Sequence, residues 1–161
     1  MTVGRIFAAN RDGAYVMKFV GDVRLNLCIA VDEFMDRMFN DPEFRSVLVD
    51  LSTTEGIDST SLGMLAKLSN RTRESERPTP VLVSTNPDIT RLLLTMGFDD
   101  VLQIIEEPLE HESQLGELPG AELGAEDLRS RVLEAHRTLM GMNEHNRLEF
   151  KDLVATLEAS G

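Results

Sequence analysis

The amino-acid sequence predicts an α/β fold, in which a mixed sheet of four or five strands packs against helices. Two short runs, 5–10 and 14–20, lie on either side of an Asp-Gly turn, which predicts an antiparallel hairpin at the start of the sheet. Nearly continuous apolar runs at 46–51 and 80–84 predict buried strands with parallel neighbours, because such strands are covered on both faces. Apolar residues at helical spacing follow these runs and predict the covering helices.

The remaining elements of this fold follow in chain order. Residues 27–39 have a helical pattern that ends at Asn40-Asp41-Pro42, and the pattern places Cys28 on or near its apolar side. A later helix begins at Asn86-Pro87, with Asn as the cap and Pro in the first turn, and ends at Gly97. Residues 101–105 then predict a last short strand.

Composition excludes several classes of protein. The chain has 161 residues and a 42% hydrophobic content, enough for one domain of usual size and an additional segment. No apolar run approaches the ~20 residues of a membrane span, and the first residues lack a signal-peptide pattern. A single cysteine excludes an internal disulfide and fits a reducing cytosol, so we expect a cytoplasmic protein without membrane contact. The net charge of −12 argues against nucleic-acid binding and suggests a basic partner.

The most informative stretch is Ile57-Asp58-Ser59-Thr60-Ser61-Leu62-Gly63, between a buried strand and a helix predicted over about 60–75. It places three consecutive hydroxyls at or just before a helix start. The first amides of a helix have no partners within it, so one interpretation is that these side chains only cap the helix.

A second interpretation comes from a resemblance. The run 58–63 resembles the Asp-Ser-Ser/Thr-Gly-Leu-Gly signature of the STAS domain family, the bacterial anti-sigma factor antagonists. Further along, Asn86, Pro87, Leu92 and Gly97-Phe98 are similar to the helix that opens with Ser-Pro or Asn-Pro in that family. The resemblance covers roughly 3–106, and we assign residues 1–106 to a STAS domain.

The resemblance implies a phosphorylation site. In the family, the second hydroxyl residue of the signature is phosphorylated, which here is Thr60, with Ser59 and Ser61 as the second and third choices. Asp58 and Gly63 belong to the same signature, and Asp22 lies in Gly21-Asp22-Val23, which is similar to the Gly-Glu-Leu-Asp that closes the second strand in the family. The final acid of that motif is replaced by Arg24, which would bring a positive charge to the site.

The resemblance also implies partners. They are an anti-sigma factor, or a serine/threonine switch kinase that is also the anti-sigma factor, and an opposing PP2C-like phosphatase. The unphosphorylated form would capture the anti-sigma factor, and the phosphorylated form would release it. The expected function is therefore partner switching without catalysis.

A docking surface for the partner is expected on the helix that carries Thr60. Met64, Lys67, Leu68 and Arg71 share the face of Thr60, and we add Asn86 as a further partner-binding candidate. A phosphate on Thr60 would add about −1.5 to −2 charge beside this face. The alternative is that Met64 and Leu68 are core residues, as most such residues are.

The chain changes character after residue 106. Residues 107–124 are acidic, contain Pro and Gly, and predict a linker. Residues 125–161 predict helices, with stripes at Leu128, Val132, Ala135 and Leu139 and at Phe150, Leu153, Val154 and Leu157. A helical hairpin is the first interpretation, and one long helix through Gly141 is the second. These stripes must pack on the domain, on each other or on a partner, so a second functional hypothesis is a scaffold that forms homo-oligomers through this extension.

The sequence offers little for catalysis. His111, His136 and His145 have no metal-ligand spacing, and no glycine-rich phosphate loop is present. Asp50, Glu55 and Asp58 could meet at one end of the sheet and hold a metal, as a minor alternative. We therefore expect a non-enzymatic protein without a cofactor or a metal.

Overall fold

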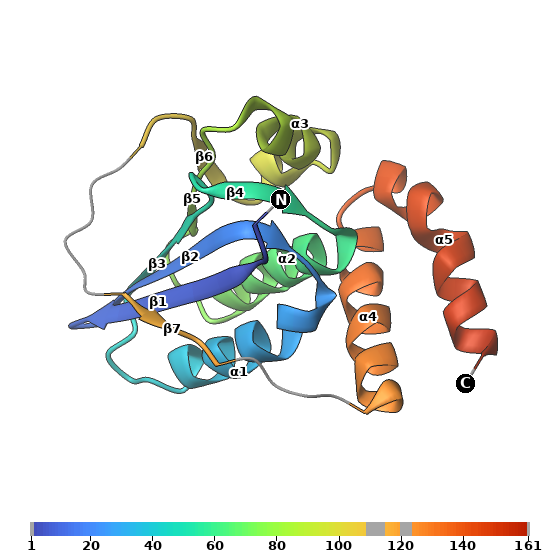
Figure 1. Cartoon of the computed structure of the whole chain (residues 1–161), viewed down its shortest axis with the longest axis horizontal. Helices are drawn as coiled ribbons and strands as arrows, with labels where there is room; N and C mark the ends of the chain where they lie inside the picture. The colour runs from blue at the N-terminus through green and yellow to red at the C-terminus, as the bar shows by residue number, and fades with distance from the viewer. Residues whose placement is uncertain (1, 109–114, 120–123, 161) are drawn as a thin grey trace.

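The computed structural model describes residues 2–108, 115–119 and 124–160 (Figure 1). It confirms the α/β fold class. Strands β1 (Arg5–Arg11) and β2 (Ala14–Val23) form the predicted antiparallel hairpin, with Arg11 opposite Ala14. Asp12 and Gly13 connect them, with φ values of 51° and 90°. Two positive φ values suit the right-handed twist of a two-residue hairpin, so the Asp-Gly pair sets the register.

The central strands are parallel. β2 pairs with β3 (Ser46–Asp50), β3 with β5 (Val81–Val83), and β5 with β6 (Gln103–Ile105). The described residues form a seven-stranded sheet, of which six strands follow the order β6-β5-β3-β2-β1-β7 and β4 pairs with β2.

Two short strands were not predicted. β4 (Thr54–Ile57) forms between the predicted strand at 46–51 and the predicted helix at about 60–75, and it pairs in parallel with the end of β2. The Thr54 hydroxyl donates to the Phe19 carbonyl at 2.7 Å, which explains how a polar segment is held at the sheet. β7 (Gly116–Glu117) pairs with β1 from within the predicted linker. Residues 109–114 and 120–123 of that linker lie outside the described residues.

Three helices pack with the sheet around a shared core. α1 (Cys28–Phe39) buries Cys28 together with its apolar stripe, and α3 (Pro87–Thr95) is capped by Asn86 and closed by Gly97 at φ 84°. α2 (Ser59–Glu74) begins one residue before the predicted start and passes behind β1 and β2 in Figure 1. The hydrophobic core lies between these helices and the sheet.

Two further helices follow, α4 (Ala125–Met140) and α5 (Glu144–Ala159), and they lie side by side at the right of Figure 1. α4 packs along α2 as well as against α5. Leu139 and Phe150 belong to the main core cluster, so this pair of helices packs on the domain and not only on itself.

The predicted stripes of these two helices are partly wrong. In α4 the buried residues are Leu133, Ala135, His136 and Leu139, whereas Leu128 and Val132 are only half-buried. In α5, Phe150 and Val154 are buried with Asn146, while Leu153 is exposed. The reason in α4 is its second contact, with α2: this contact buries a polar residue, His136, that does not belong to the predicted stripe.

No helix among the described residues is both long enough and apolar enough to span a membrane.

Candidate functional site: the start of α2 beneath α4

The carboxylate of Asp58 organises the start of α2. Asp58 is the N-cap, and its Oδ1 accepts from the Ser61 amide at 2.8 Å. Its Oδ2 accepts from the Leu25 amide at 2.7 Å. One side chain therefore satisfies an otherwise unpaired helical amide and ties the helix to the segment that follows β2.

The three hydroxyls of the signature have different surroundings. Thr60 is 3% exposed and Ser61 is 4% exposed, so both side chains point into the domain. Ser59 is half-buried, and its Oγ lies 2.8 Å from Nε2 of His136 in α4. The capping interpretation holds for Asp58, whose side chain makes the cap, rather than for the hydroxyls.

The ring of His136 is fixed by its own helix. Its Nδ1 lies 2.7 Å from the Val132 carbonyl, which can only accept, so Nδ1 carries the proton and donates. In the tautomer with its proton on Nδ1, Nε2 is an acceptor, and the Ser59 hydroxyl donates to it. The ring also packs edge-on against Phe150, with centroids 5.2 Å apart, and the residue is 2% exposed.

The sequence analysis did not find the pairing of His136 with Ser59. The two residues are 77 positions apart, and a histidine beside an apolar stripe carries no signal of its partner. Of the other two histidines, His145 is exposed at the start of α5, and His111 lies outside the described residues.

Gly63 is where α2 and α4 come closest. A Cβ atom built on Gly63 would lie 2.5 Å from the Ala135 carbonyl oxygen and 2.6 Å from the Ala135 Cβ. Real side chains do not approach so closely, so α4 can lie here only because residue 63 has no side chain. Gly63 thus has a structural role toward α4, in addition to the role that the resemblance implies.

A cluster of charges joins α1, α2 and α4. Asp32 of α1 is 1% exposed, accepts from Lys67 Nζ at 2.8 Å, and pairs with Arg131 of α4. Lys67 also pairs with Glu134 of α4 at 2.7 Å. Burial alone lowers the pKa of Lys67, but its hydrogen bonds to Asp32 and Glu134 outweigh burial and hold that pKa above its ordinary value. Burial likewise lowers the pKa of Arg131, but the hydrogen bond to Asp32 and the charges of Asp32 and Glu134 together outweigh burial, so that the pKa of Arg131 is raised.

The other predicted docking residues of α2 contact their own domain. Met64 is 3% exposed and Leu68 is fully buried, as the core alternative requires. Arg71 pairs with Asp36 at 2.7 Å and lies over the Phe39 ring at 4.4 Å. In this conformation, therefore, the face of α2 that carries Thr60 is not open to a partner.

The remaining predicted residues lie around this centre or apart from it. Asp22 pairs with Arg24 at 2.8 Å, and the Arg24 side chain is largely exposed, so its charge is neutralised beside the site rather than placed within it. Asn86 accepts from the Asp88 amide at 3.0 Å as the cap of α3, and its Nδ2 donates to the Thr54 carbonyl at 3.5 Å.

The three acids considered for a metal do not meet. Asp50 accepts from the Ser52 amide at 2.8 Å, and Glu55 accepts from the Thr2 amide at 2.9 Å, while Asp58 caps α2. Within residues 2–108, 115–119 and 124–160, no group of three or more His, Cys, Asp or Glu side chains is placed to hold a metal ion.

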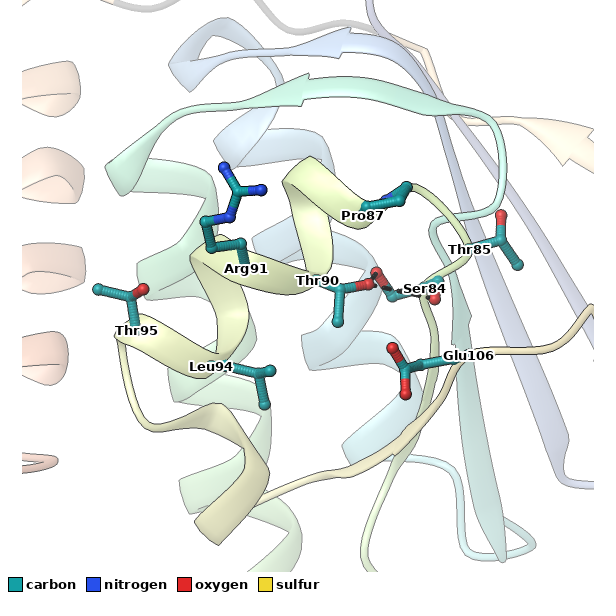
Figure 2. A pocket seen from close by; sticks show the side chains of 8 residues that line it. All are labelled: Ser84, Thr85, Pro87, Thr90, Arg91, Leu94, Thr95 and Glu106. Atoms are coloured by element: carbon teal, nitrogen blue, oxygen red, sulfur yellow. Dashed lines mark hydrogen bonds between the residues drawn. The ribbon is translucent and has the colours of Figure 1, made fainter.

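Figure 2 shows a hollow of about 400 Å³ beside α3. It is lined from the ends of β5 and β6 and from α3, by Ser84, Thr85, Pro87, Thr90, Arg91, Leu94, Thr95 and Glu106. The Ser84 and Thr90 hydroxyls are buried and hydrogen-bond to each other at 2.8 Å. Its buried polar groups are thus already satisfied by the protein, and the hollow contains no residue of the signature.

Comparison with known proteins agrees with the fold. The STAS domain family model matches residues 6–111, which is well over half of the chain. The protein therefore belongs to the STAS domain family. The α4–α5 pair lies outside the matched region.

A solved structure gives the same picture of the fold. The chain is similar to the crystal structure of a protein from Thermotoga maritima described as "a putative anti-sigma factor antagonist". The two share 21% identity over 60% of this chain and 82% of that chain, with a TM-score of 0.53. No curated protein matches the chain significantly.

Proposed function

We propose that this protein is a phosphorylation-controlled partner-switching regulator of the anti-sigma factor antagonist type. Its role is binding rather than catalysis, and its partner is an anti-sigma factor or a serine/threonine switch kinase. The phosphate would be removed by a PP2C-like phosphatase. The observation that carries this proposal is the row of hydroxyls at the capped start of α2, in a chain of the STAS family.

The start of α2 suits an added phosphate. The helix dipole is positive at this end, which favours an anion there. A phosphate of about −1.5 to −2 charge would leave the helix intact and change the surface around it. In the reaction, the hydroxyl oxygen bonds to the γ-phosphorus of ATP, ADP leaves, and the hydroxyl proton passes to a base of the kinase.

The acceptor is Thr60 or Ser59, with Ser61 as the third choice. The resemblance favours Thr60, which is buried, whereas accessibility favours Ser59, which is half-buried and one position earlier. Thr60 would need a local opening of the start of α2 before a kinase could reach it. Asp58 holds that start in place and would govern the opening.

The test is phosphosite mapping by mass spectrometry on protein purified from its native host, with and without phosphatase treatment. We expect phosphate on Thr60 or Ser59, and a partner that co-purifies only with the unmodified form. In pull-downs from host cells, T60D and S59D should weaken capture, and T60A and S59A should preserve it. Equal capture by the Asp and Ala variants at both positions would refute partner switching.

A second candidate is a non-enzymatic scaffold that assembles with other STAS proteins. The specific observation in its favour is that all three hydroxyls are buried or already bonded, which suits a protein that is never phosphorylated. This candidate predicts a partner or a second copy bound in the absence of phosphate under several growth conditions. Light scattering on the purified protein would then give a mass above 18.0 kDa.

A further inference from the structure

The α4–α5 pair covers the part of the domain that the proposed function needs. At Ser59, the hydroxyl hydrogen-bonds to Nε2 of His136, and at Gly63 the backbone of Ala135 fills the space where a side chain would stand. Ser59 and Gly63 lie one helical turn apart on α2. The same helix, α4, therefore covers both ends of this turn.

A phosphate on Ser59 does not fit beneath α4. The phosphorylated oxygen has no proton to donate, so the hydrogen bond from the Ser59 hydroxyl to Nε2 of His136 would be lost. The phosphoryl group would also need the space in which Nε2 now stands, 2.8 Å away. The docked position of α4 and the phosphorylated form of Ser59 thus exclude each other.

Many of the contacts that hold α4 and α5 in place are polar and can be replaced by water or by a partner. Asp32 pairs with Arg131, and Lys67 pairs with Glu134. At the other end, Asn143 and Asn146 donate to the Met96 carbonyl at 3.0 and 2.9 Å.

The docked state also carries a penalty. Within the part of the chain that the structure describes, Oδ1 of Asn146 is buried without a hydrogen-bond partner, and an unsatisfied buried acceptor opposes docking. Undocking returns this oxygen to water. It removes Leu139 and Phe150 from the core cluster, whose other buried members belong to residues 6–102.

We propose that α4 and α5 are an internal competitor for the partner: they occupy the face of α2 that carries Ser59, Gly63 and Lys67, and they hold Ser59 unavailable until they are displaced. This inference rests on the proposed function. It also specifies the partner surface, since a partner must supply what α4 supplies. We expect the partner to present a helix with a cation for Asp32, a carboxylate for Lys67 and a small residue against Gly63. These three groups would have the spacing that Arg131, Glu134 and Ala135 have in α4.

The sharpest variant is G63A. Alanine has a higher helix propensity than glycine, so the change supports α2 itself while its Cβ excludes Ala135. Hydrogen exchange followed by mass spectrometry on the full chain should show exchange at least tenfold faster in α4 and α5. The amides of β2, β3 and β5 should keep their protection. The matched control is G116A, because a Cβ on Gly116 meets nothing within 4 Å.

A reversible crosslink between α2 and α4 would hold α4 in its docked position. In a C28A background, K67C and E134C replace an ion pair that joins α2 to α4, and a short bis-methanethiosulfonate reagent would link them. The full chain would be incubated with ATP and a soluble extract of its host, and Ser59 would be mapped for phosphate. We expect no phosphate while the link is intact, recovery after reduction with dithiothreitol, and a several-fold gain in G63A.

The outcomes separate the inference from the proposed function. Loss of protection in β2 and β3 together with α4 in G63A would overturn the inference, because α4 would then be inseparable from the core. Phosphorylation of Ser59 in the linked protein at the rate of the reduced protein would overturn it as well. Selective release of α4 and α5 in G63A, with no phosphate on Ser59 or Thr60 in any form, would support the internal competitor and refute phosphorylation control.

Discussion

At the scale of single residues, one carboxylate, that of Asp58, holds the start of α2 in place. Asp58 accepts two backbone hydrogen bonds, from Ser61 and from Leu25, and no hydroxyl of the signature replaces it as the cap. The Asp of the signature thus has a mechanical role that is separate from any phosphate. It determines where the helix begins, and with that which of the neighbouring hydroxyls faces outward.

The first prediction concerns this cap. We expect D58A to lower the free energy of unfolding by about 2 kcal/mol, because a cap is lost and the Leu25 amide is left without its partner. D58N should cost about half as much, since it keeps one carbonyl acceptor for the Ser61 amide. Urea denaturation followed by circular dichroism would measure both. Equal stability of D58A and the wild type would contradict the capping role.

The second prediction concerns Tyr15, the one tyrosine of the chain. Burial raises the pKa of Tyr15 to about 12, and its hydrogen bond to Asp41 at 2.6 Å adds to this rise. Because the pKa is raised in the folded state, the stabilisation is complete below pH 10 and is lost as the pH rises from about 10 to 12. Absorbance near 295 nm reports this residue alone, as the chain has no tryptophan.

We expect the tyrosinate transition near pH 12 in the wild type. In D41N it should fall toward 10 without reaching it, because burial remains. Circular dichroism at each pH would verify that the protein is still folded. A midpoint at 10 in the folded wild type would contradict the burial of this phenol.

At the scale of elements, the sequence predicts those that carry a local signal. The Asp-Gly hairpin, the buried strand β3 and the Asn-Pro start of α3 each combine a turn or cap residue with an apolar run, and all three form as expected. β4 and β7 carry no such signal, because each is a short segment that is ordered by pairing with a strand far away in the chain. Their existence depends on tertiary pairing and is invisible in local periodicity.

The site shows the same division. The capped start of α2 could be predicted from the run that begins at Asp58, because a cap is local. The contact of Ser59 with His136 and that of Gly63 with Ala135 could not, because each joins residues more than 70 positions apart. The polar residues of α4 at this interface also hid its buried side from an apolar pattern.

The third prediction concerns the charged link between α1, α2 and α4. D32A should lower the free energy of unfolding by about 3 kcal/mol, because Lys67 and Arg131 lose a buried counter-charge. D36A is the matched control, as Asp36 lies one turn further along α1 and its pair with Arg71 is largely exposed. We expect less than about 1 kcal/mol for D36A. Equal losses in the two variants would show that the buried link is no stronger than a surface pair.

At the scale of the whole molecule, α4 and α5 form part of the folded domain. Leu139 and Phe150 belong to the same apolar cluster as the strands, and Met96 of the α3 end accepts from α5. A sequence alone could not decide whether the predicted helices would pack on the domain or on a partner. The surplus of acidic residues is the second property at this scale, since a net charge of −12 acts on every part of the surface at once.

The last prediction follows from that charge. Repulsion among the acids opposes the compact state, and salt screens exposed charges while it barely affects the buried pair at Asp32. Raising NaCl from 20 to 500 mM should therefore stabilise the protein by roughly 1 kcal/mol, which corresponds to about 2–4 °C in Tm. The double variant E149Q and D152N removes two exposed acids of α5 and should show a smaller rise. A fall in Tm with salt would mean that attractive surface pairs such as Arg5–Glu117 outweigh the repulsion among the acids. The acidic surface would then not destabilise the fold, and a basic partner would gain no stability by neutralising it.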